Sequence, residues 1–217
     1  MLRLEVGGGE PLLLLPEKAV YAPRHGALLI ADAHFGKAVS FRRLGVPVPR
    51  GTTSETLAVL DGLIERTGAR RIVVLGDFLH SARAHAASTL GALARWRARR
   101  PRFELTLVRG NHDARAGDPP PALGIEVVDE PFVLGLLALC HHPSPREGRY
   151  TLAGHLHPCI TLPGRAHDRL RLPCFHFGER VGVLPAFGAF TGMHPIEPAH
   201  GDRVFVATGE QVVELPR

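Results

Sequence analysis

The sequence lacks any apolar run approaching the roughly 20 residues that a membrane-spanning helix requires. Its longest leucine run, Leu12–Leu15, lies between Pro11 and Pro16, and no basic segment with a small-residue cleavage site surrounds it. These absences predict a protein without a membrane segment and without a signal peptide.

Cysteine is scarce as well, because the 217 residues include only Cys140, Cys159 and Cys174. An odd number of cysteines without C-x-x-C spacing argues against a disulfide framework and a thiolate zinc site, so we expect a cytoplasmic protein. The sequence also lacks internal repeats, low-complexity tracts and linkers. A chain of this length can bury one core, and we expect a single domain over residues 1–217.

The composition is globular, with 45% hydrophobic and 22% charged residues. The formal net charge is +5 and the sequence pI is about 9.7. A basic balance favours anionic partners such as nucleic acid, although charge by itself selects no particular one.

Apolar runs in the first half of the chain alternate with helical patterns. A helix is predicted from the capping box of Thr52 and Glu55 to Gly68, and a second helix over Ala86–Ala98. Helical crossovers between apolar strands imply a sheet with parallel pairs. Strands are predicted over Leu2–Val6, Leu12–Leu15, Ala27–Ile30, Arg71–Leu75 and Phe103–Val108.

Helical patterning fades after Asp113, and the second half is expected to be sheet and loop. Its strand-like runs are Glu126–Val128, Leu136–Cys140, Arg169–Phe177, Val181–Leu184, Val204–Ala207 and Gln211–Leu215.

Metal-ligand residues follow apolar segments at five places along the chain. Taken alone, each of the five is consistent with a tight turn whose polar side chain is hydrogen-bonded within the protein. Since strand ends of an α/β sheet converge on one edge, the five together favour a single metal site there. They are Asp32-x-His34, Gly76-Asp77, Gly110-Asn111-His112-Asp113, His141-His142 and Gly154-His155-Leu156-His157.

The candidate ligands are carboxylates, imidazoles and one carboxamide, without a thiolate. This set suits borderline divalent ions such as manganese, iron, zinc or nickel, and we expect manganese. Seven ligands are too many for one tetrahedral zinc, but they fit two ions about 3.5–4 Å apart that share a carboxylate. Asp77, which stands alone after its glycine, is the expected bridge.

The order of motifs resembles the calcineurin-like metallophosphoesterase superfamily, whose pattern is D-x-H, G-D, G-N-H-[DE], H and G-H-x-H. The resemblance runs from Asp32 to His157. It implies an α/β fold, a four-layer α-β-β-α sandwich of two mixed sheets with the dimetal site at strand ends. It assigns one metal to Asp32, His34, Asp77 and His157, and the other to Asp77, Asn111, His141 and His155.

The same resemblance implies a mechanism. A hydroxide that bridges the metals attacks the phosphate, and His112, oriented by Asp113, protonates the leaving oxygen. General acid catalysis of this kind contributes about 10²–10⁴-fold.

Three segments resemble a narrower family, the bacterial ligase-associated DNA damage response endonucleases of the PdeM type. These segments are Asp32–Lys37, Phe41–Thr53 and Leu184–Gly192. The family is associated with DNA repair, depends on manganese and cuts phosphodiesters in DNA. Protein phosphatases of the superfamily carry G-D-x-x-D-R-G, and here His80 and Ser81 replace the Asp-Arg pair, so protein phosphatase activity is disfavoured.

At two positions near the predicted ligands, an alternative interpretation stays open. His141 is preferred over His142 because it comes first after its strand and adjacent side chains point in different directions. His80 is a candidate substrate contact, or equally a satisfied polar neighbour of the ligands.

Basic and aromatic residues are weaker candidates for nucleic-acid contact. Lys37, Arg42, Arg43 and Arg50, on the predicted loop after the first motif, suit a phosphate backbone, although exposed loops also carry such charges for solubility. For the arginines of residues 95–102 around Trp96, interaction with a helix dipole is the favoured interpretation over strand binding. Phe187 and Phe190 either stack a base or pack the second sheet.

We therefore expect a manganese-type phosphodiesterase that acts on DNA, preferentially single-stranded, as a repair endonuclease. The resemblance to the ligase-associated family also implies a ligase or helicase as a partner protein. One alternative is a phosphodiesterase or pyrophosphatase for small nucleotides. The other is a non-catalytic scaffold of the same fold, which the retention of His112 with the whole ligand set disfavours.

Overall fold

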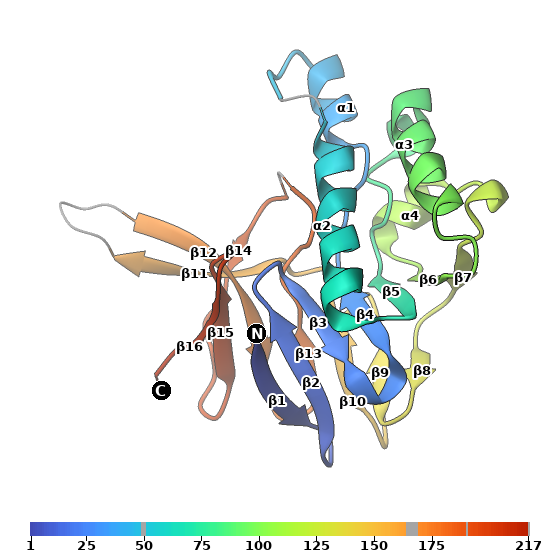
Figure 1. The fold of residues 1–217 in the computed structure, drawn as a ribbon. Coiled ribbons are helices and arrows are strands. Elements are labelled where there is room, and N and C mark those ends of the chain that lie inside the picture. Colours follow the sequence, from blue (N-terminus) through green and yellow to red (C-terminus); the bar gives the residue numbers. More distant parts are fainter. Residues whose placement is uncertain (49–50, 164–168, 190, 217) are drawn as a thin grey trace.

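The computed structural model describes residues 1–48, 51–163, 169–189 and 191–216. Two β-sheets pack face to face, and the helices cover the outer face of the first sheet (Figure 1). Two of the family-like segments lie partly outside the described residues, at positions 49–50 and 190, so the prediction for Phe190 falls there too.

The first sheet has seven strands in chain order. Neighbouring strands are antiparallel from β1 to β4 and parallel from β4 to β7. All four residues of β4 are buried because helices cover one face of the sheet and the second sheet covers the other. The strands are β1 Leu2–Val6, β2 Glu10–Leu15, β3 Ala19–Ala22, β4 Ala27–Ile30, β5 Arg71–Leu75, β6 Glu104–Val108 and β7 Glu126–Val128.

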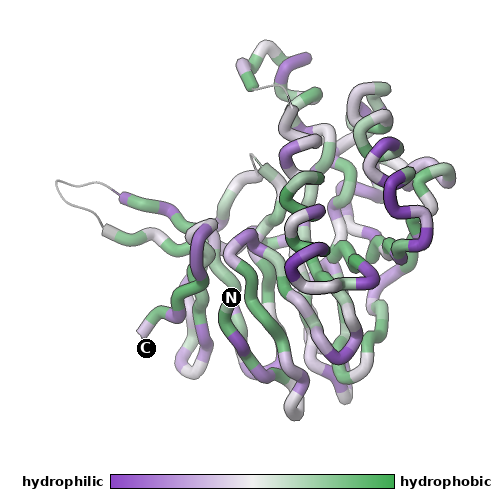
Figure 2. The backbone as a smooth tube through the Cα atoms, viewed as in Figure 1, coloured by the Kyte–Doolittle hydropathy of each residue, from purple (hydrophilic) through white to green (hydrophobic). Residues whose placement is uncertain are grey.

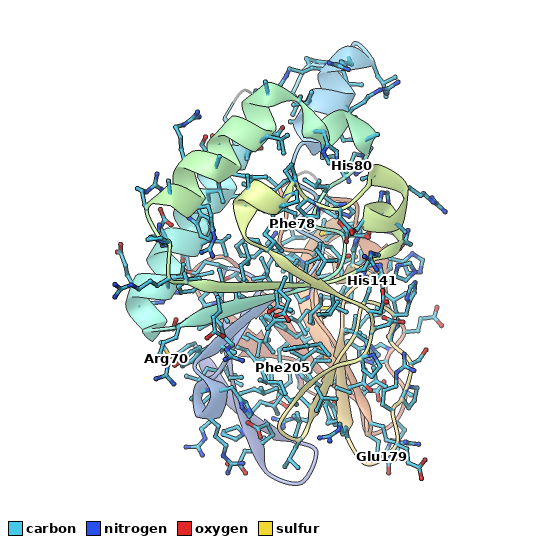
Figure 3. All side chains as sticks on the ribbon, turned by 90° about the vertical axis from the view of Figure 1, so that its right-hand side faces the viewer. Arg70, Phe78, His80, His141, Glu179 and Phe205 are labelled. Atoms are coloured by element: carbon cyan, nitrogen blue, oxygen red, sulfur yellow. The ribbon has the colours of Figure 1, made fainter. Side chains whose placement is uncertain are left out.

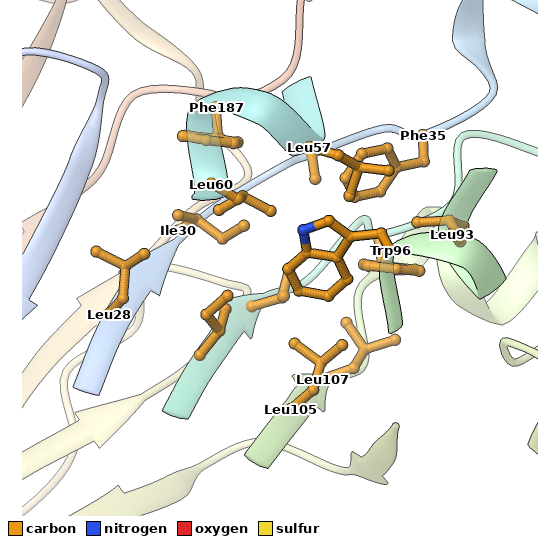
Figure 4. Close-up of a cluster of buried hydrophobic side chains, with 14 of the residues drawn as sticks. Leu28, Ile30, Phe35, Leu57, Leu60, Leu93, Trp96, Leu105, Leu107 and Phe187 are labelled. Carbon is orange, nitrogen blue, oxygen red and sulfur yellow. The ribbon is translucent and has the colours of Figure 1, made fainter. Parts of the chain in front are cut away.

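In the described residues, the α-helices lie between Lys37 and Ala116. They are α1 Lys37–Arg43, α2 Thr52–Thr67, α3 Ala87–Ala98 and α4 Asn111–Ala116, with short 3₁₀ turns at Pro23–His25, Ala82–His85 and Pro121–Leu123. Leu57 and Leu60 of α2 and Trp96 of α3 pack against Ile30 and Leu107 of the sheet (Figure 4). Each such side chain contributes about 1.5–3 kcal/mol when it is fully buried.

Two local predictions about helices are wrong. The capping box does not form, because the N-cap of α2 is Gly51, at φ 93°, and its carbonyl oxygen accepts the Glu55 N–H at 2.9 Å. Lys37, Arg42 and Arg43 lie on helix α1 rather than on a loop. Only two residues of α1 are buried, so it carries no apolar stripe that a periodicity argument could detect.

The second sheet has nine strands. Strands β9, β10 and β13 run parallel at its centre, and β15 pairs with β12 and β16. In the described part of the chain beyond Leu123, every regular element is a strand. The strands are β8 Phe132–Leu134, β9 Leu137–Leu139, β10 Tyr150–Ala153, β11 Pro158–Pro163, β12 Arg169–Phe177, β13 Val181–Val183, β14 His194–Pro195, β15 Arg203–Ala207 and β16 Val212–Glu214.

The main apolar layer lies between the two sheets, where Leu29 and Val73 of the first meet Leu139, Phe175 and Phe205 of the second. Figure 2 shows the corresponding concentration of hydrophobic residues along the strands. The predicted α/β fold with two mixed sheets is confirmed. No helix in the described residues is long and apolar enough to span a membrane.

Candidate metal centre

Five strands in two parallel groups end at one edge of the molecule, and a candidate ligand follows each of them. Strands β4, β5 and β6 are parallel in the first sheet, and β9 and β10 are parallel in the second. Parallel strands place their carboxyl ends together, so residues far apart in the sequence meet there. The residues that follow are Asp32, Asp77, Asn111, His141 and His155. In Figure 3, His141 lies near mid-height on the right-hand side with His80 above it, and Glu179 lies at the bottom of the molecule.

Asp77 lies in the middle of this group and is buried. Its Oδ1 atom is 3.5 Å from His141 Nε2, and its Oδ2 atom is 3.8 Å from His34 Nε2. One carboxylate thus faces a histidine of each predicted metal position, which is the arrangement that a shared ligand requires.

The first group of donors consists of Asp32, His34 and His157, whose ligand atoms lie within 4.8 Å of one another. Asp32 Oδ1 is 3.4 Å from His157 Nε2. Three buried atoms, Asp32 Oδ1, His34 Nδ1 and His157 Nε2, have no hydrogen-bond partner among the described residues. A buried polar atom without a partner costs about 1–3 kcal/mol. A divalent cation held by Asp32 Oδ1 and His157 Nε2 would remove that cost for these two atoms.

The second group is built around His141, which is fully buried. Its Nδ1 atom lies 3.1 Å from the Leu75 carbonyl oxygen, which can only accept a hydrogen bond, so Nδ1 carries the proton. The lone pair of Nε2 then points at Asn111 Oδ1, 2.8 Å away, and His155 Nδ1 is 3.1 Å from the same nitrogen. An imidazole lone pair and a carboxamide oxygen that face each other fit a shared cation.

The neighbouring His142 takes a different position. Its side chain is 46% exposed, and its Nδ1 atom lies 3.1 Å from Glu130 Oε1. Glu130 Oε2 also accepts the backbone N–H groups of His141 and His142, at 2.7 and 3.0 Å. His141 is therefore the buried one of the two, and the ligand atoms of His141, His142 and His155 lie within 4.8 Å of one another. No motif in the sequence marks Glu130.

Backbone strain concentrates at the same place. Six described residues other than glycine have φ in the left-handed region, and five of the six are candidate ligands with φ between 45° and 71°. Each such residue costs about 1–3 kcal/mol and persists only where the surrounding structure holds it. The five are Asp32, His34, Asp77, His155 and His157.

The glycines of three motifs make room for ligands from neighbouring strands. A Cβ atom on Gly76 would overlap the ring of His141, and one on Gly110 would overlap the Asp77 carboxylate. A Cβ on Gly154 would lie 2.6 Å from Asp32 Oδ2. Each glycine therefore leaves space for a ligand side chain from another motif. This explains why glycine, and no larger residue, stands just before or beside the ligand residues.

The candidate acid His112 faces the centre from the first turn of α4. Its Nε2 atom is 3.9 Å from Asp77 Oδ2, and its Nδ1 atom donates to the His80 carbonyl oxygen at 2.8 Å. Asp113 was predicted to orient this imidazole. Its carboxylate instead accepts the backbone N–H groups of Leu79 and Gly110, at 3.1 and 3.0 Å.

Comparisons with known proteins place this geometry in a family. No family model matches the chain, and no curated protein matches it. Among solved structures, the nuclease MPE of Pseudomonas putida is 46% identical over 99% of both chains, with a TM-score of 0.88. The chain belongs to the calcineurin-like metallophosphoesterase superfamily. The YfcE phosphoesterase of E. coli is 13% identical over 87% of this chain and 97% of its own, with a TM-score of 0.43, too distant to bear on function.

Burial sets the electrostatics of this metallophosphoesterase centre. It lowers the pKa of His34 to about 2, an effect to which the charge of Lys37 adds, and it lowers the pKa of His141 and His155. The rings of His34, His141 and His155 are therefore neutral at neutral pH and present lone pairs. Burial raises the pKa of Asp77, and the nearby Asp32 charge adds to the effect. Positive charge between these carboxylates would relieve their repulsion.

Among the basic candidates of this metallophosphoesterase that the structure describes, Lys37 approaches the centre, and Arg50 lies outside the described residues. It is half-buried at the start of α1, its Nζ lies 5.8 Å from the centre of the Phe41 ring, and it interacts electrostatically with Asp32 and Asp77. Arg42 and Arg43 are exposed further along α1. His80 lies between the rings of Phe41 and His112, and burial lowers its pKa to about 4.

Several of the other aromatic and basic candidates have structural partners. Trp96 is buried and donates to Asp61, which also pairs with Arg100 at 2.8 Å. Arg97 donates to the Leu123 carbonyl oxygen at 2.9 Å. Phe187 is buried beside Leu60, so its ring is not available to stack a base.

Proposed function

We propose that this metallophosphoesterase is a dimetal phosphodiesterase that cleaves single-stranded DNA in a repair setting. The observation that carries the proposal is the pair of donor groups that share Asp77 at the strand ends. Membership of the family supplies the reaction class. The nuclease among its relatives supports a nucleic-acid substrate, and the resemblance to ligase-associated endonucleases supports repair and a ligase or helicase partner.

Two divalent ions, with manganese our first choice, fit the donor atoms. One ion would be held by Asp32, His34, Asp77 and His157, and the other by Asp77, Asn111, His141 and His155. When bound, such a pair supplies positive charge for the phosphate oxygens and an activated water molecule.

The protein's own residues then provide orientation and a proton. His112 directs Nε2 towards the centre because its Nδ1–H is fixed on the His80 carbonyl oxygen. In that position a protonated His112 meets the leaving oxygen. We assign Asp113 a positioning role, since its hydrogen bonds to Gly110 and Leu79 join the two loops that carry His112 and His80.

An open site favours a polymer over a small nucleotide. The His112 side chain is 34% exposed, so a strand that lies across the surface can reach it. Lys37 adds positive charge beside the centre, through its electrostatic interaction with Asp32 and Asp77.

The test compares substrates under one set of conditions. Single-stranded and duplex oligonucleotides, a cyclic nucleotide and a dinucleotide pyrophosphate are incubated with the protein and manganese, with chelator as the negative control. We expect internal cuts in the single strand, strongest with manganese. Turnover of the small nucleotides with uncut oligonucleotides would refute the nuclease proposal. Products that shorten only from one end would refute endonucleolytic cleavage.

A further inference from the structure

The described residues of the segment Leu184–Gly192, one of the family-like motifs, connect two candidate ligands from different sheets. The Phe187 N–H donates to the Ala31 carbonyl oxygen at 2.8 Å, and the Gly188 N–H donates to that of Asp32 at 3.2 Å. A side chain at Gly188 would overlap the Ala33 carbonyl group, so only glycine lets the segment approach this closely. The segment thereby holds the backbone that carries Asp32.

The end of the same segment holds His157. The Nδ1–H of His157 donates to the Gly192 carbonyl oxygen at 3.1 Å. That bond fixes the tautomer, because a carbonyl oxygen can only accept, and leaves the Nε2 lone pair towards Asp32 Oδ1. Thr191 Oγ1 donates to the Gly188 carbonyl oxygen at 3.0 Å and ties the two ends of the segment together.

Lys18 contacts this segment from the outside, across 169 positions of sequence. Its ammonium group donates to the Phe187 carbonyl oxygen at 3.0 Å. The side chain lies in a cleft of about 490 Å³ between α2, β12 and the turn after β15. Lys18 is also the sixth non-glycine residue in the left-handed region, at φ 65°, and burial lowers its pKa to about 8.

These features make lysine at position 18 unfavourable for the stability of the folded protein. Glycine would remove the strain at this φ, and an apolar side chain would suit the cleft without a buried charge. The hydrogen bond to Phe187 is the feature that only a long donor side chain supplies at this position.

We propose that Lys18 is a positioning residue of the metal centre, which acts by fixing the segment that holds Asp32 and the tautomer of His157. The proposal rests on the proposed function only through the assignment of these two residues as ligands. Without the Lys18 donor, the Phe187 carbonyl group loses its partner, the segment loosens, and both ligands lose part of their fixed geometry. Loss of an outer partner of this kind typically lowers metal affinity by about 10–100-fold.

The test compares Lys18→Met and Lys18→Gly with the wild type. The glycine variant relieves the positive φ and is expected to fold, so a change in both variants cannot come from misfolding. Arg66→Met is the matched control, because Arg66 pairs with Glu17 in the same turn at 2.7 Å without contact to the segment. Calorimetric titration of metal-free protein with manganese measures affinity, and we expect a loss on the order of 10-fold in both Lys18 variants and none in the control.

Nitrogen-15 spectra of the histidine rings provide a readout that does not depend on metal or on substrate. The His157 signals, assigned by their loss in His157→Gln, should show one tautomer with Nδ1–H in the wild type and an averaged pair of shifts in both Lys18 variants. Unchanged affinity together with unchanged His157 shifts would overturn the proposal. Because neither measurement uses DNA, a failure of the substrate proposal leaves this test intact.

Discussion

Replacing Gly76 by alanine adds one carbon atom beside the buried ring of His141. Gly76 has φ 79°, and a left-handed conformation costs a residue with a side chain about 1–2 kcal/mol. The new Cβ also overlaps the His141 ring, which cannot move away because it is fully buried and its Nδ1–H donates to the Leu75 carbonyl oxygen. Overpacking of this kind costs about 1–3 kcal/mol. Gly76→Ala should therefore lose roughly 2–5 kcal/mol of stability, the sum of the two effects.

Gly62→Ala provides the matched control. Gly62 lies on the exposed side of α2, and an added Cβ meets nothing within 4 Å. Alanine stabilises a helix interior by about 1 kcal/mol over glycine, so the same substitution should have the opposite sign there. Urea unfolding of the metal-free proteins measures both changes, and manganese titration should show weakened binding only for Gly76→Ala. A Gly76→Ala protein with wild-type stability and wild-type affinity would refute the reasoning about motif glycines.

Three further predictions concern single side chains. Asp77→Ala should abolish metal-dependent hydrolysis of a model phosphodiester and reduce the content of both metals by elemental analysis; full activity would refute its bridging role. His112→Ala should retain metal but lose about 10²–10⁴-fold in turnover, with a smaller loss for a p-nitrophenyl ester, whose leaving group needs no acid. For Lys18, burial lowers the folded-state pKa from 10.5 to about 8, so the unfolded chain binds more protons between these pH values. The wild type should therefore gain about 3 kcal/mol over Lys18→Met in urea unfolding as pH rises from 8 to 10.5, and a difference that is constant with pH would refute the buried charge.

The strand ends that carry the candidate ligands could be predicted because each follows a run with an unambiguous pattern. Strands β4 and β5 are found at the predicted residues, since both faces of these strands are covered and their apolar runs are continuous. The burial of His141 rather than His142 also followed from the sequence, because His141 comes first after β9. The two-sheet arrangement, in contrast, came from family resemblance, because periodicity carries no information on which sheets pack together.

The contacts that orient the ligands could not be predicted, because most of them are backbone atoms. His112, His141 and His157 each donate to a carbonyl oxygen, and a carbonyl group leaves no signature in a sequence. The expectation that Asp113 orients His112, which came from the family resemblance, shows the consequence, because the Asp113 carboxylate accepts the backbone N–H groups of Leu79 and Gly110 instead. Helix α1 was missed for a different reason, because seven residues with two buried positions produce no period.

The strained backbone explains why the ligands follow buried strands directly instead of standing on free loops. Five candidate ligands in the left-handed region together cost roughly 5–15 kcal/mol, at about 1–3 kcal/mol each. That cost is as large as the net stability of a typical domain, about 5–15 kcal/mol. A loop would relax to remove such strain. Here Asp32 is bonded to Gly76, His155 and Gly188, which belong to three separate segments, so relaxation at one ligand would break contacts in both sheets. The apolar layer between the sheets thus maintains the geometry of the centre, and the same sequence motifs placed on an isolated peptide would not reproduce it.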